Sequence, residues 1–295
     1  MSKFAFFLGC QIPFRVPLME AAARKALTRF DIDLVNMPLA CCPDPIGVRS
    51  ISTETWYTLA ARNLCVAEEM GLDIMTMCNG CFETLKTANE ELKHDKALKE
   101  SVNTRLAEIG KEWKGTIKVK HGTQVLFDDI GLERIQQEVQ EPSPVSHLKI
   151  AAHSGCHFTK PSDILQTDDP DRPQLLMKLI GATGATPVNY RGSALCCGTG
   201  ILNIDSKGAS QIARTKLHRV QAAKADAMIT SCPFCFLQYD SGQLIINRTF
   251  KGSLKIPILD SFELVALAIG IHPNELGLKL HRVKTKSIIR EEAPL

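Results

Sequence analysis

The stretches PLACCPD (residues 38–44) and SALCCGT (residues 193–199) each place two cysteines side by side. A disulfide within such a pair is unfavourable, because Cα atoms joined by a trans peptide lie about 3.8 Å apart, whereas disulfides usually need roughly 4.4–6.8 Å. The paired thiols are therefore expected to bind something other than each other. On either side of the two pairs, ten of the eleven cysteines fall into two sets of five with a common order.

These two sets, the first and the second quintet, have similar spacing. In the first, thirty residues separate a single cysteine from the pair and thirty-five separate the pair from a Cys-x-x-Cys motif; in the second, the intervals are thirty-nine and thirty-four. Two sets at matching intervals indicate an internal repeat. The first quintet is Cys10, Cys41, Cys42, Cys78 and Cys81, and the second is Cys156, Cys196, Cys197, Cys232 and Cys235.

Short apolar runs lead into the cysteines of both halves. KFAFFLGC (residues 3–10) corresponds to LKIAAHSGC (residues 148–156), and DIMTMCNGC (residues 73–81) corresponds to DAMITSCPFC (residues 226–235). We expect these runs to be strands and the amphipathic stretches between them to be helices. The alternation predicts an α/β fold, with a mainly parallel sheet flanked by helices in each half and the cysteines at the C-terminal ends of the strands.

A boundary between the halves is predicted near residue 145. The segment QEPSPVSH (residues 140–147) contains two prolines and two serines, a composition typical of a linker. We therefore predict two pseudo-repeated domains, a first cysteine-rich domain over residues 1–145 and a second over residues 146–295.

Composition excludes several classes of partner. The 295 residues are 44% hydrophobic and 23% charged with a net charge of +3, as in an ordinary globular protein, and no basic run is dense enough to suggest nucleic acid. The apolar run FELVALAIGI (residues 262–271) is shorter than the roughly 20 residues that span a bilayer. The N-terminal MSKFAFFLGC is predicted to contain a buried strand rather than an export signal. We therefore expect a cytoplasmic protein with no membrane span, in which recurring cysteines serve metal binding or catalysis.

The Cys-x-x-Cys motifs resemble metal sites at helix starts. Residues three apart share a helix face, and the N–H groups of the first turn stabilise nearby thiolates. Zinc would use four thiolates in a closed tetrahedral site and would leave one cysteine unused in each half. Iron–sulfur clusters also bind cysteine thiolates, normally four. The residues favour iron–sulfur over zinc, and over thiol redox chemistry, while a fifth thiol in each half indicates either a reactive cysteine or a cluster with more than four ligands.

The whole pattern resembles the cysteine-rich CCG domain family and, from about residue 3 to residue 282, the B subunit of heterodisulfide reductase. The matching motifs are FFLGC (6–10), LACCPDP (39–45), ARNLCVAEEMG (61–71), CNGC (78–81), GCHFTKPS (155–162), CCG (196–198), CPFC (232–235) and ELGLKLHR (275–282). The loop GTGILNID (residues 198–205) has fewer glycines than the family pattern. The resemblance implies two non-cubane [4Fe-4S] clusters, one held by each quintet.

The resemblance also implies a reaction and partners. The family reduces the small-molecule disulfide of coenzyme M and coenzyme B to two thiols, receiving electrons through a ferredoxin-like C subunit and a flavin-containing A subunit, in a larger complex linked to a hydrogenase or a formate dehydrogenase. This chain has neither the Cys-x2-Cys-x2-Cys-x3-Cys-Pro run of a ferredoxin nor a G-x-G-x-x-G fingerprint, so its electrons are expected to come from such partners.

Five further residues are candidates for the reaction. His153 and His157 flank Cys156, and as imidazoles that titrate near neutral pH they are candidate proton donors, or alternatively hydrogen-bond donors to cluster sulfurs. Arg49, Lys160 and Arg191 lie near cysteine loops and are candidates to bind the anionic groups of the substrate.

Two other functions remain open. The chain could be an iron–sulfur electron-transfer subunit of a different dehydrogenase or thiol-carrier complex, without cleavage of an S–S bond, or a zinc-stabilised interaction module. The remaining cysteine, Cys65, lies among apolar residues of a predicted helix and is expected to be a small buried hydrophobe.

Overall fold

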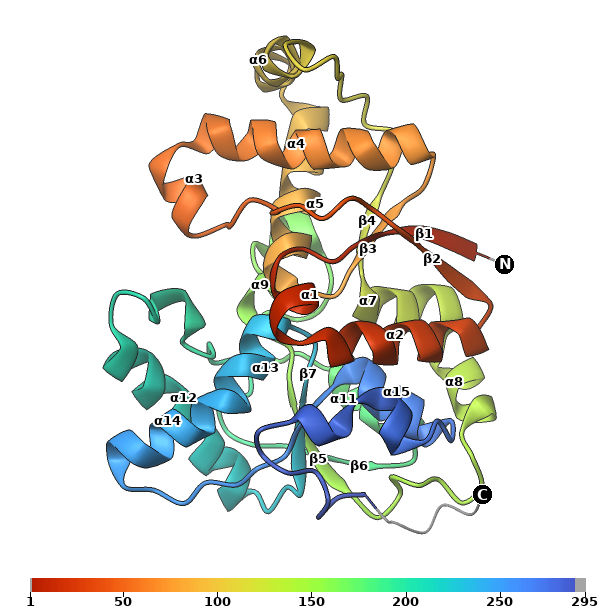
Figure 1. The fold of residues 1–295 in the computed structure, drawn as a ribbon, viewed down its shortest axis with the longest axis vertical. Helices are drawn as coiled ribbons and strands as arrows, with labels where there is room; N and C mark the ends of the chain where they lie inside the picture. The colour runs from red at the N-terminus through yellow and green to blue at the C-terminus, as the bar shows by residue number, and fades with distance from the viewer. Residues whose placement is uncertain (1, 290–295) are drawn as a thin grey trace.

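The computed structural model describes residues 2–289 and contains two parallel four-stranded sheets (Figure 1). The strand order is β2-β1-β3-β4 in the first sheet and β6-β5-β7-β8 in the second. The predicted α/β class, with a repeated parallel sheet flanked by helices, is confirmed. The strands are β1 Ser2–Phe7, β2 Ile32–Asn36, β3 Ile74–Thr76 and β4 Val119–His121, then β5 Lys149–His153, β6 Thr186–Val188, β7 Ala227–Thr230 and β8 Ile258–Asp260.

The helices of the first half have local causes in the sequence. Helix α2 begins with a proline in its first turn, and α4 begins at a Ser52 cap and ends at Gly71, whose φ of 66° suits the C-terminal cap. The helical elements are α1 Gln11–Arg15, α2 Pro17–Arg29, α3 Gly47–Ile51, α4 Thr53–Met70, α5 Asn79–His94, α6 Lys96–Ala107, α7 Gly122–Gln124, the π-helical turn η1 Val125–Ile130 and α8 Leu132–Glu138.

The second half repeats this order of strands and helices. Its helices are α9 Cys156–Thr159, α10 Ser162–Leu165, α11 Leu175–Ala182, α12 Ser206–Ala222, α13 Pro233–Tyr239, α14 Ser241–Phe250 and α15 Ser261–Ala268, with 3-10 turns η2 Thr199–Ile201, η3 Pro273–Leu276 and η4 Leu278–Leu280. Like α5 in the first half, α13 follows the third strand and contains the second cysteine of a Cys-x-x-Cys motif.

The strand registers align the ends that precede the cysteines. In the first sheet Phe7 pairs with Thr76, and Thr76 pairs with His121. In the second sheet His153 pairs with Thr230, which in turn pairs with Asp260. Because all of these strands are parallel, the loops that follow them leave from one edge of each sheet.

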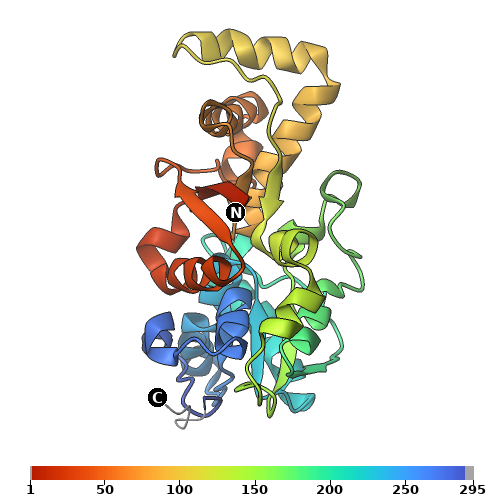
Figure 2. The same ribbon diagram turned by 90° about the vertical axis from the view of Figure 1, so that its right-hand side faces the viewer.

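The two halves exchange their last helices. Helix α15, which follows the last strand of the second half, packs on α2 of the first half, whereas α8 of the first half packs on α11 of the second (Figure 1). The backbone N–H of Gln140 donates to the carbonyl of Ala268 at 2.9 Å beside this contact. Figure 2 shows the halves stacked along the long axis of the molecule. In the sequence, the strands of the first sheet precede residues 140–147 and those of the second sheet follow them. The predicted division into two domains near residue 145 stays a prediction.

The apolar run FELVALAIGI is a core element. Every residue of α15 is buried, because the helix is enclosed between its own sheet and helix α2. Across residues 2–289, none of the helices combines the length and the apolar character needed to cross a membrane.

His281, near the end of the described chain, forms a buried ion pair that fastens this segment to α15. Its Nε2 lies 2.9 Å from Oε1 of Glu263, and neither side chain is exposed. Burial lowers the pKa of His281, but the charge of Glu263 and the hydrogen bond to it outweigh burial, so the pKa is raised above the ordinary 6.5. The stabilisation is therefore complete below about pH 6.5 and is lost as the pH rises through the raised pKa.

A His281→Gln variant is expected to lose about 2 kcal/mol of unfolding free energy at pH 6 and less at pH 9, because a neutral amide keeps the hydrogen bond but not the charge. Denaturant unfolding at both pH values measures this difference. The exposed His218→Gln of α12 is the control and should change stability little at either pH. A loss that is equal at both pH values would contradict a charged histidine.

Candidate metal centre

The cysteines of both quintets lie at the ends of strands, as predicted. Cys10 follows β1 and immediately precedes α1, while Cys78 caps α5 and Cys81 lies in its first turn. In the second half Cys156 begins α9 after β5. Cys232 caps α13 after β7, with Cys235 one turn further, and each CC pair lies in the loop after the second strand of its half.

The thiols of the first quintet are in mutual contact. Cys41 adjoins Cys42, Cys42 adjoins Cys81 and Cys81 adjoins Cys78, so that each thiol shifts the pKa of the next, and Cys10 is close enough for its charge to raise the pKa of Cys41. Gly9, at a φ of +63°, allows this approach: a Cβ there would lie 2.8 Å from Sγ of Cys81. The close approach of backbone to sulfur therefore needs a glycine.

The second quintet has the same arrangement. Cys156 adjoins Cys196, Cys196 adjoins Cys197, Cys197 adjoins Cys235 and Cys235 adjoins Cys232, so that each thiol shifts the pKa of the next. All eleven cysteines of the chain are free thiols. The pairs at the centre of the quintets therefore bridge the first cysteine of each half to its Cys-x-x-Cys motif, and they form no disulfide.

The two quintets meet at Cys78 and Cys232. Their thiols adjoin each other, and the interaction with Cys232, followed by that with Cys81, lowers the pKa of Cys78 to about 5. The pKa of Cys232 is raised to about 11, chiefly by burial. Next to this contact, Nδ2 of Asn79 donates to the carbonyl of Ser154 at 2.7 Å, which ties the start of α5 to the loop after β5. The ten sulfurs thus form one continuous group across the two halves.

Charge is unevenly distributed within this group. Interactions with the Cys156 and Cys197 thiols lower the pKa of Cys196 to about 2, whereas the interaction with Cys196 raises the pKa of Cys197 to about 11. One ionised sulfur therefore opposes ionisation of its neighbours. A bound cation would remove this opposition and let all the thiols ionise, so the donor set fits a metal centre.

Buried polar atoms without partners adjoin the sulfurs. Among residues 2–289, Nε2 of His153, the hydroxyl of Tyr239, Nε2 of His121 and Oδ2 of Asp260 are buried and have no hydrogen-bond partner. The charge of Cys232 shifts the pKa values of His121 and Asp260, and the charges of Cys197 and Cys235 shift that of Tyr239. His153 in turn shifts the pKa of Cys196. Orphaned groups of this kind are what an occupied site would satisfy.

His153 lies against the second quintet. One of its ring nitrogens and the Sγ atoms of Cys197 and Cys235 lie within 4.8 Å of one another. Its Nδ1 is 2.7 Å from Nζ of Lys216, a fully buried lysine of α12. Burial, followed by the charge of Lys216, lowers the pKa of His153 well below its ordinary value, so the imidazole is neutral at neutral pH. Its predicted role as a proton donor stays a prediction.

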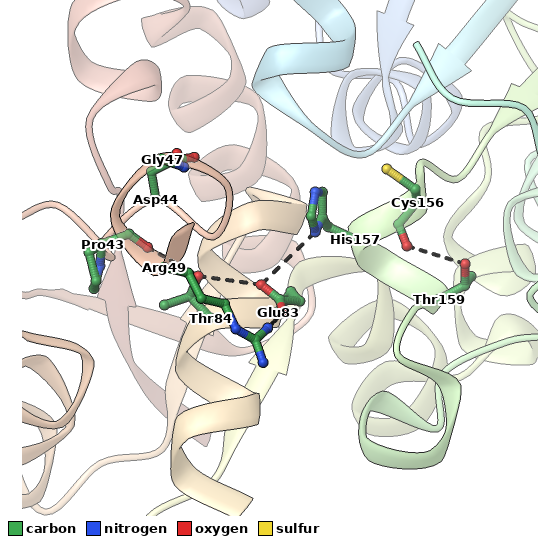
Figure 3. A network of polar contacts seen from close by, with 9 residues as sticks. All are labelled: Pro43, Asp44, Gly47, Arg49, Glu83, Thr84, Cys156, His157 and Thr159. Atoms are coloured by element: carbon green, nitrogen blue, oxygen red, sulfur yellow. Dashed lines mark hydrogen bonds and ion pairs between the residues drawn. The ribbon is translucent and has the colours of Figure 1, made fainter. Parts of the chain in front are cut away.

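His157 and Arg49 converge on a buried carboxylate, Glu83 (Figure 3). Nη1 of Arg49 lies 3.2 Å from Oε1 of Glu83, and Nδ1 of His157 lies 4.0 Å from Oε2. The hydroxyl of Thr84 donates to the carbonyl of Pro43 at 3.1 Å, which connects the network to the first CC loop. Burial raises the pKa of Glu83 to about 7 despite the Arg49 charge. Arg49 also stacks on Trp56, 4.6 Å from the ring centroid, so its guanidinium is already engaged within the chain.

The other two predicted substrate residues lie at the surface, and their role stays a prediction. Lys160 is exposed and makes a long contact, 3.7 Å, with the exposed Asp171, and Arg191 is exposed in the loop before the second CC pair. Cys65 is buried on α4 and belongs to neither quintet, and burial raises its pKa to about 12.

Sequence analysis missed four residues around the sulfurs: Glu83, Lys216, His121 and Asp260. Glu83 and Lys216 occupy helix positions where charged residues usually face solvent, so nothing in their local sequence marked them as buried. His121 and Asp260 could have been found, because each ends the fourth apolar run of its half, and the ends of parallel strands meet at one edge of a sheet.

Comparison with known proteins agrees with this arrangement. A family model described as a cysteine-rich domain, CCG, matches residues 4–86 and 150–240, one match for each half. The chain is 38% identical over 287 residues to the B subunit of ferredoxin/F(420)H(2)-dependent CoB-CoM heterodisulfide reductase from Methanosarcina acetivorans, covering 96% of this chain and 95% of that protein. It is 28% identical over 276 residues to the 8-methylmenaquinol:fumarate reductase membrane anchor subunit of Wolinella succinogenes, covering 94% and 95%.

A solved structure shares the fold. A hypothetical protein from Helicobacter pylori superposes with a TM-score of 0.76 at 18% identity, covering 96% of this chain and 52% of that one. The family model accounts for both quintets, and the Methanosarcina relative aligns along nearly the whole chain. The chain therefore belongs to the cysteine-rich CCG domain family, within the group of heterodisulfide reductase B subunits.

Proposed function

We propose that this protein reduces the mixed disulfide of coenzyme M and coenzyme B to the two thiols. The contact between Cys78 and Cys232 carries the proposal, because it brings two equivalent five-thiol sites together. A disulfide contains two sulfur atoms, and paired sites can receive the two departing thiolates separately. The name of the Methanosarcina acetivorans relative supports the same iron–sulfur disulfide oxidoreductase activity for this chain.

The proposed cofactors are two non-cubane [4Fe-4S] clusters, one for each quintet. Within residues 2–289, the one compact set of potential metal ligands has three donors, His153, Cys197 and Cys235, and a closed zinc site needs four. Five contacting thiols over a wider site suit a polynuclear cluster better than a single ion. When bound, such clusters would supply single electrons and iron with affinity for thiolate sulfur.

Exposure suggests how the other candidate residues act. Lys160 and Arg191 are exposed near the second quintet and are proposed to bind the anionic groups of the substrate. Arg49 is proposed to hold Glu83 in place, since it is already paired and stacked. His157, whose side chain is 33% exposed, can exchange a proton with solvent more readily than the enclosed His153. We therefore favour His157 as the proton donor.

Electron-delivering partners complete the proposal. The chain has no ferredoxin-type motif and no dinucleotide fingerprint, so a ferredoxin-like C subunit and a flavin-containing A subunit are proposed to supply its electrons, within a larger hydrogenase- or formate-dehydrogenase-linked complex. Three of the quintet cysteines, Cys10, Cys41 and Cys196, are exposed, so the sulfur group reaches the surface in both halves.

A second candidate is an electron-transfer role without S–S cleavage. The relative from Wolinella succinogenes, which aligns along 94% of this chain, is named as part of a fumarate reductase. That similarity supports a role for this chain in a complex with a different named substrate.

Anaerobic purification followed by electron paramagnetic resonance separates the two candidates. The protein is expected to be coloured, to contain iron and sulfide, and to give a signal that changes when coenzyme M is added under oxidising conditions. If the protein contains iron but its paramagnetic signal does not change on addition of coenzyme M, the electron-transfer function is favoured. Zinc in place of iron would overturn both.

A further inference from the structure

The two quintets are alike in their sulfurs but differ in a buried charge. Lys216 of α12 lies behind the second quintet with no exposed surface. Its Nζ donates to the carbonyl oxygens of Ser193, at 2.8 Å, and Leu195, in the loop that leads into the second CC pair. It also lies 2.7 Å from Nδ1 of His153. A lysine therefore holds this cysteine loop from inside the protein.

The first half has a neutral residue in the matching place. Asn63 of α4, the long helix that follows the first CC pair and the short α3, is also buried. Its Nδ2 donates to the carbonyl oxygens of Cys41 at 2.8 Å and Cys42 at 3.4 Å. Asn63 and Lys216 thus perform the same task, fastening the CC loop to the next helix, and only Lys216 bears a charge.

A second difference lies at the ends of the central strands. His153 stands three residues before Cys156, and the residue three before Cys10 is Phe7. Phe7 is buried and apolar, whereas His153 is the polar contact of Lys216. The second half therefore carries a lysine–histidine pair where the first half carries asparagine and phenylalanine.

The other charges near the quintets increase this asymmetry. In the first half, the negative charge of Asp44 raises the pKa of Cys42, and the charge of Cys42 raises the pKa of Glu83. The positive charge there, Arg49, is paired with Glu83. In the second half, Nζ of Lys216 has three acceptors, the carbonyl oxygens of Ser193 and Leu195 and Nδ1 of His153, which match the three N–H donors of an ammonium group. Its charge acts strongly, because a buried site has a low effective dielectric constant.

We infer that Lys216 makes the second quintet the stronger electron acceptor of the two sites, so that its cluster is reduced at the higher potential. The inference rests on the proposed function, since it requires an iron–sulfur cluster in each quintet. A site that gains an electron gains negative charge, and a fixed buried cation stabilises that reduced form. Electrons delivered to the protein would accordingly collect in the second half.

The test is a stepwise reductive titration of the full chain with dithionite, followed by electron paramagnetic resonance. Cys10→Ser and Cys156→Ser variants assign the signals, because each removes a ligand of one quintet only. In the unaltered protein the signal of the second quintet should appear at the higher potential. In Lys216→Met, the oxidised-to-reduced ratio of the second quintet at a given potential should change about tenfold, which is a downward shift of about 59 mV for one electron. The potential of the first quintet's signal should stay the same.

Two further variants serve as controls. Asn63→Ala removes the matching hydrogen bonds in the first half without changing charge, and Lys216→Arg keeps the charge, so neither should move the second potential by a comparable amount. Equal shifts of both signals, no shift in Lys216→Met, or a higher potential for the first quintet would overturn the inference. The comparison of the two potentials is made in the unaltered protein, so it tests the inference even if Lys216→Met does not fold. A chain without iron would instead overturn the proposed function itself.

Discussion

Serine in place of Cys81 is expected to remove about half of the iron from the anaerobically purified protein and to reduce disulfide turnover at least about a hundredfold. Cys81 contacts both Cys42 and Cys78, so it joins the CC pair to the residue at the boundary between the halves. A hydroxyl is a poor ligand for iron in such sites, which bind thiolates. The second quintet keeps all five thiols, and the remaining iron should be held there.

Iron per chain and turnover with a reduced viologen as electron donor measure the two effects. Cys65→Ala is the matched control, because Cys65 is equally buried but lies on α4 outside both quintets, and it should retain full iron. Unchanged iron in Cys81→Ser would exclude the first quintet as a ligand set. Complete loss of iron would show that the ten thiols hold one indivisible centre.

Alanine in place of Gly155 is expected to destabilise the protein by about 4 kcal/mol and to lower the iron content of the second quintet. Gly155 has a φ of 79° and a ψ of 154°, a conformation that costs other residues about 1–3 kcal/mol. A Cβ there would also lie 2.3 Å from Nδ2 of Asn79 and 3.5 Å from Sγ of Cys235. Relieving that overlap would displace the side chain that ties the two halves together, with a further cost of about 1–3 kcal/mol.

Gly131 provides a control with nearly the same backbone. Its φ is 84° and its ψ is 144°, it caps a helix as Gly155 does, and no atom lies within 4 Å of a Cβ placed there. Gly131→Ala should therefore lose only about 2 kcal/mol and keep its iron. Denaturant unfolding and iron analysis compare the two variants, and equal losses would mean that the contact of Gly155 with Asn79 is unimportant.

Much of the fold could be predicted from cysteine spacing and apolar runs. Apolar runs that end in Gly-Cys or Cys-x-x-Cys became the central strands β1, β3, β5 and β7, because a run buried on both faces of a parallel sheet is continuously apolar. The same reasoning placed the quintets at the strand ends. The contact between Cys78 and Cys232 could not be predicted, since a repeated sequence describes each copy but contains no local signal for how the copies dock.

Charged residues were harder to place than cysteines. Arg49 was selected for its nearness in sequence to a cysteine loop, and the structure shows it paired with Glu83, a residue whose local sequence is that of an ordinary helix. Lys216 also lies in a helix rich in basic residues, where only tertiary packing decides which lysine is buried. Whether Lys160 and Arg191 bind substrate depends on a ligand's position, which spacing along the chain does not contain.

The exchange of α8 and α15 between the halves has a consequence for the integrity of the molecule. A protease cut within residues 140–147 should yield two fragments that copurify, because each fragment supplies a helix that covers the other. The separation of the two sulfur sites is thereby fixed by these packed helices, together with the hydrogen bond from Asn79 to Ser154, and not by the connecting peptide. Lengthening that peptide should leave the geometry between the sites intact, and two separately expressed pieces should be able to assemble into a working whole.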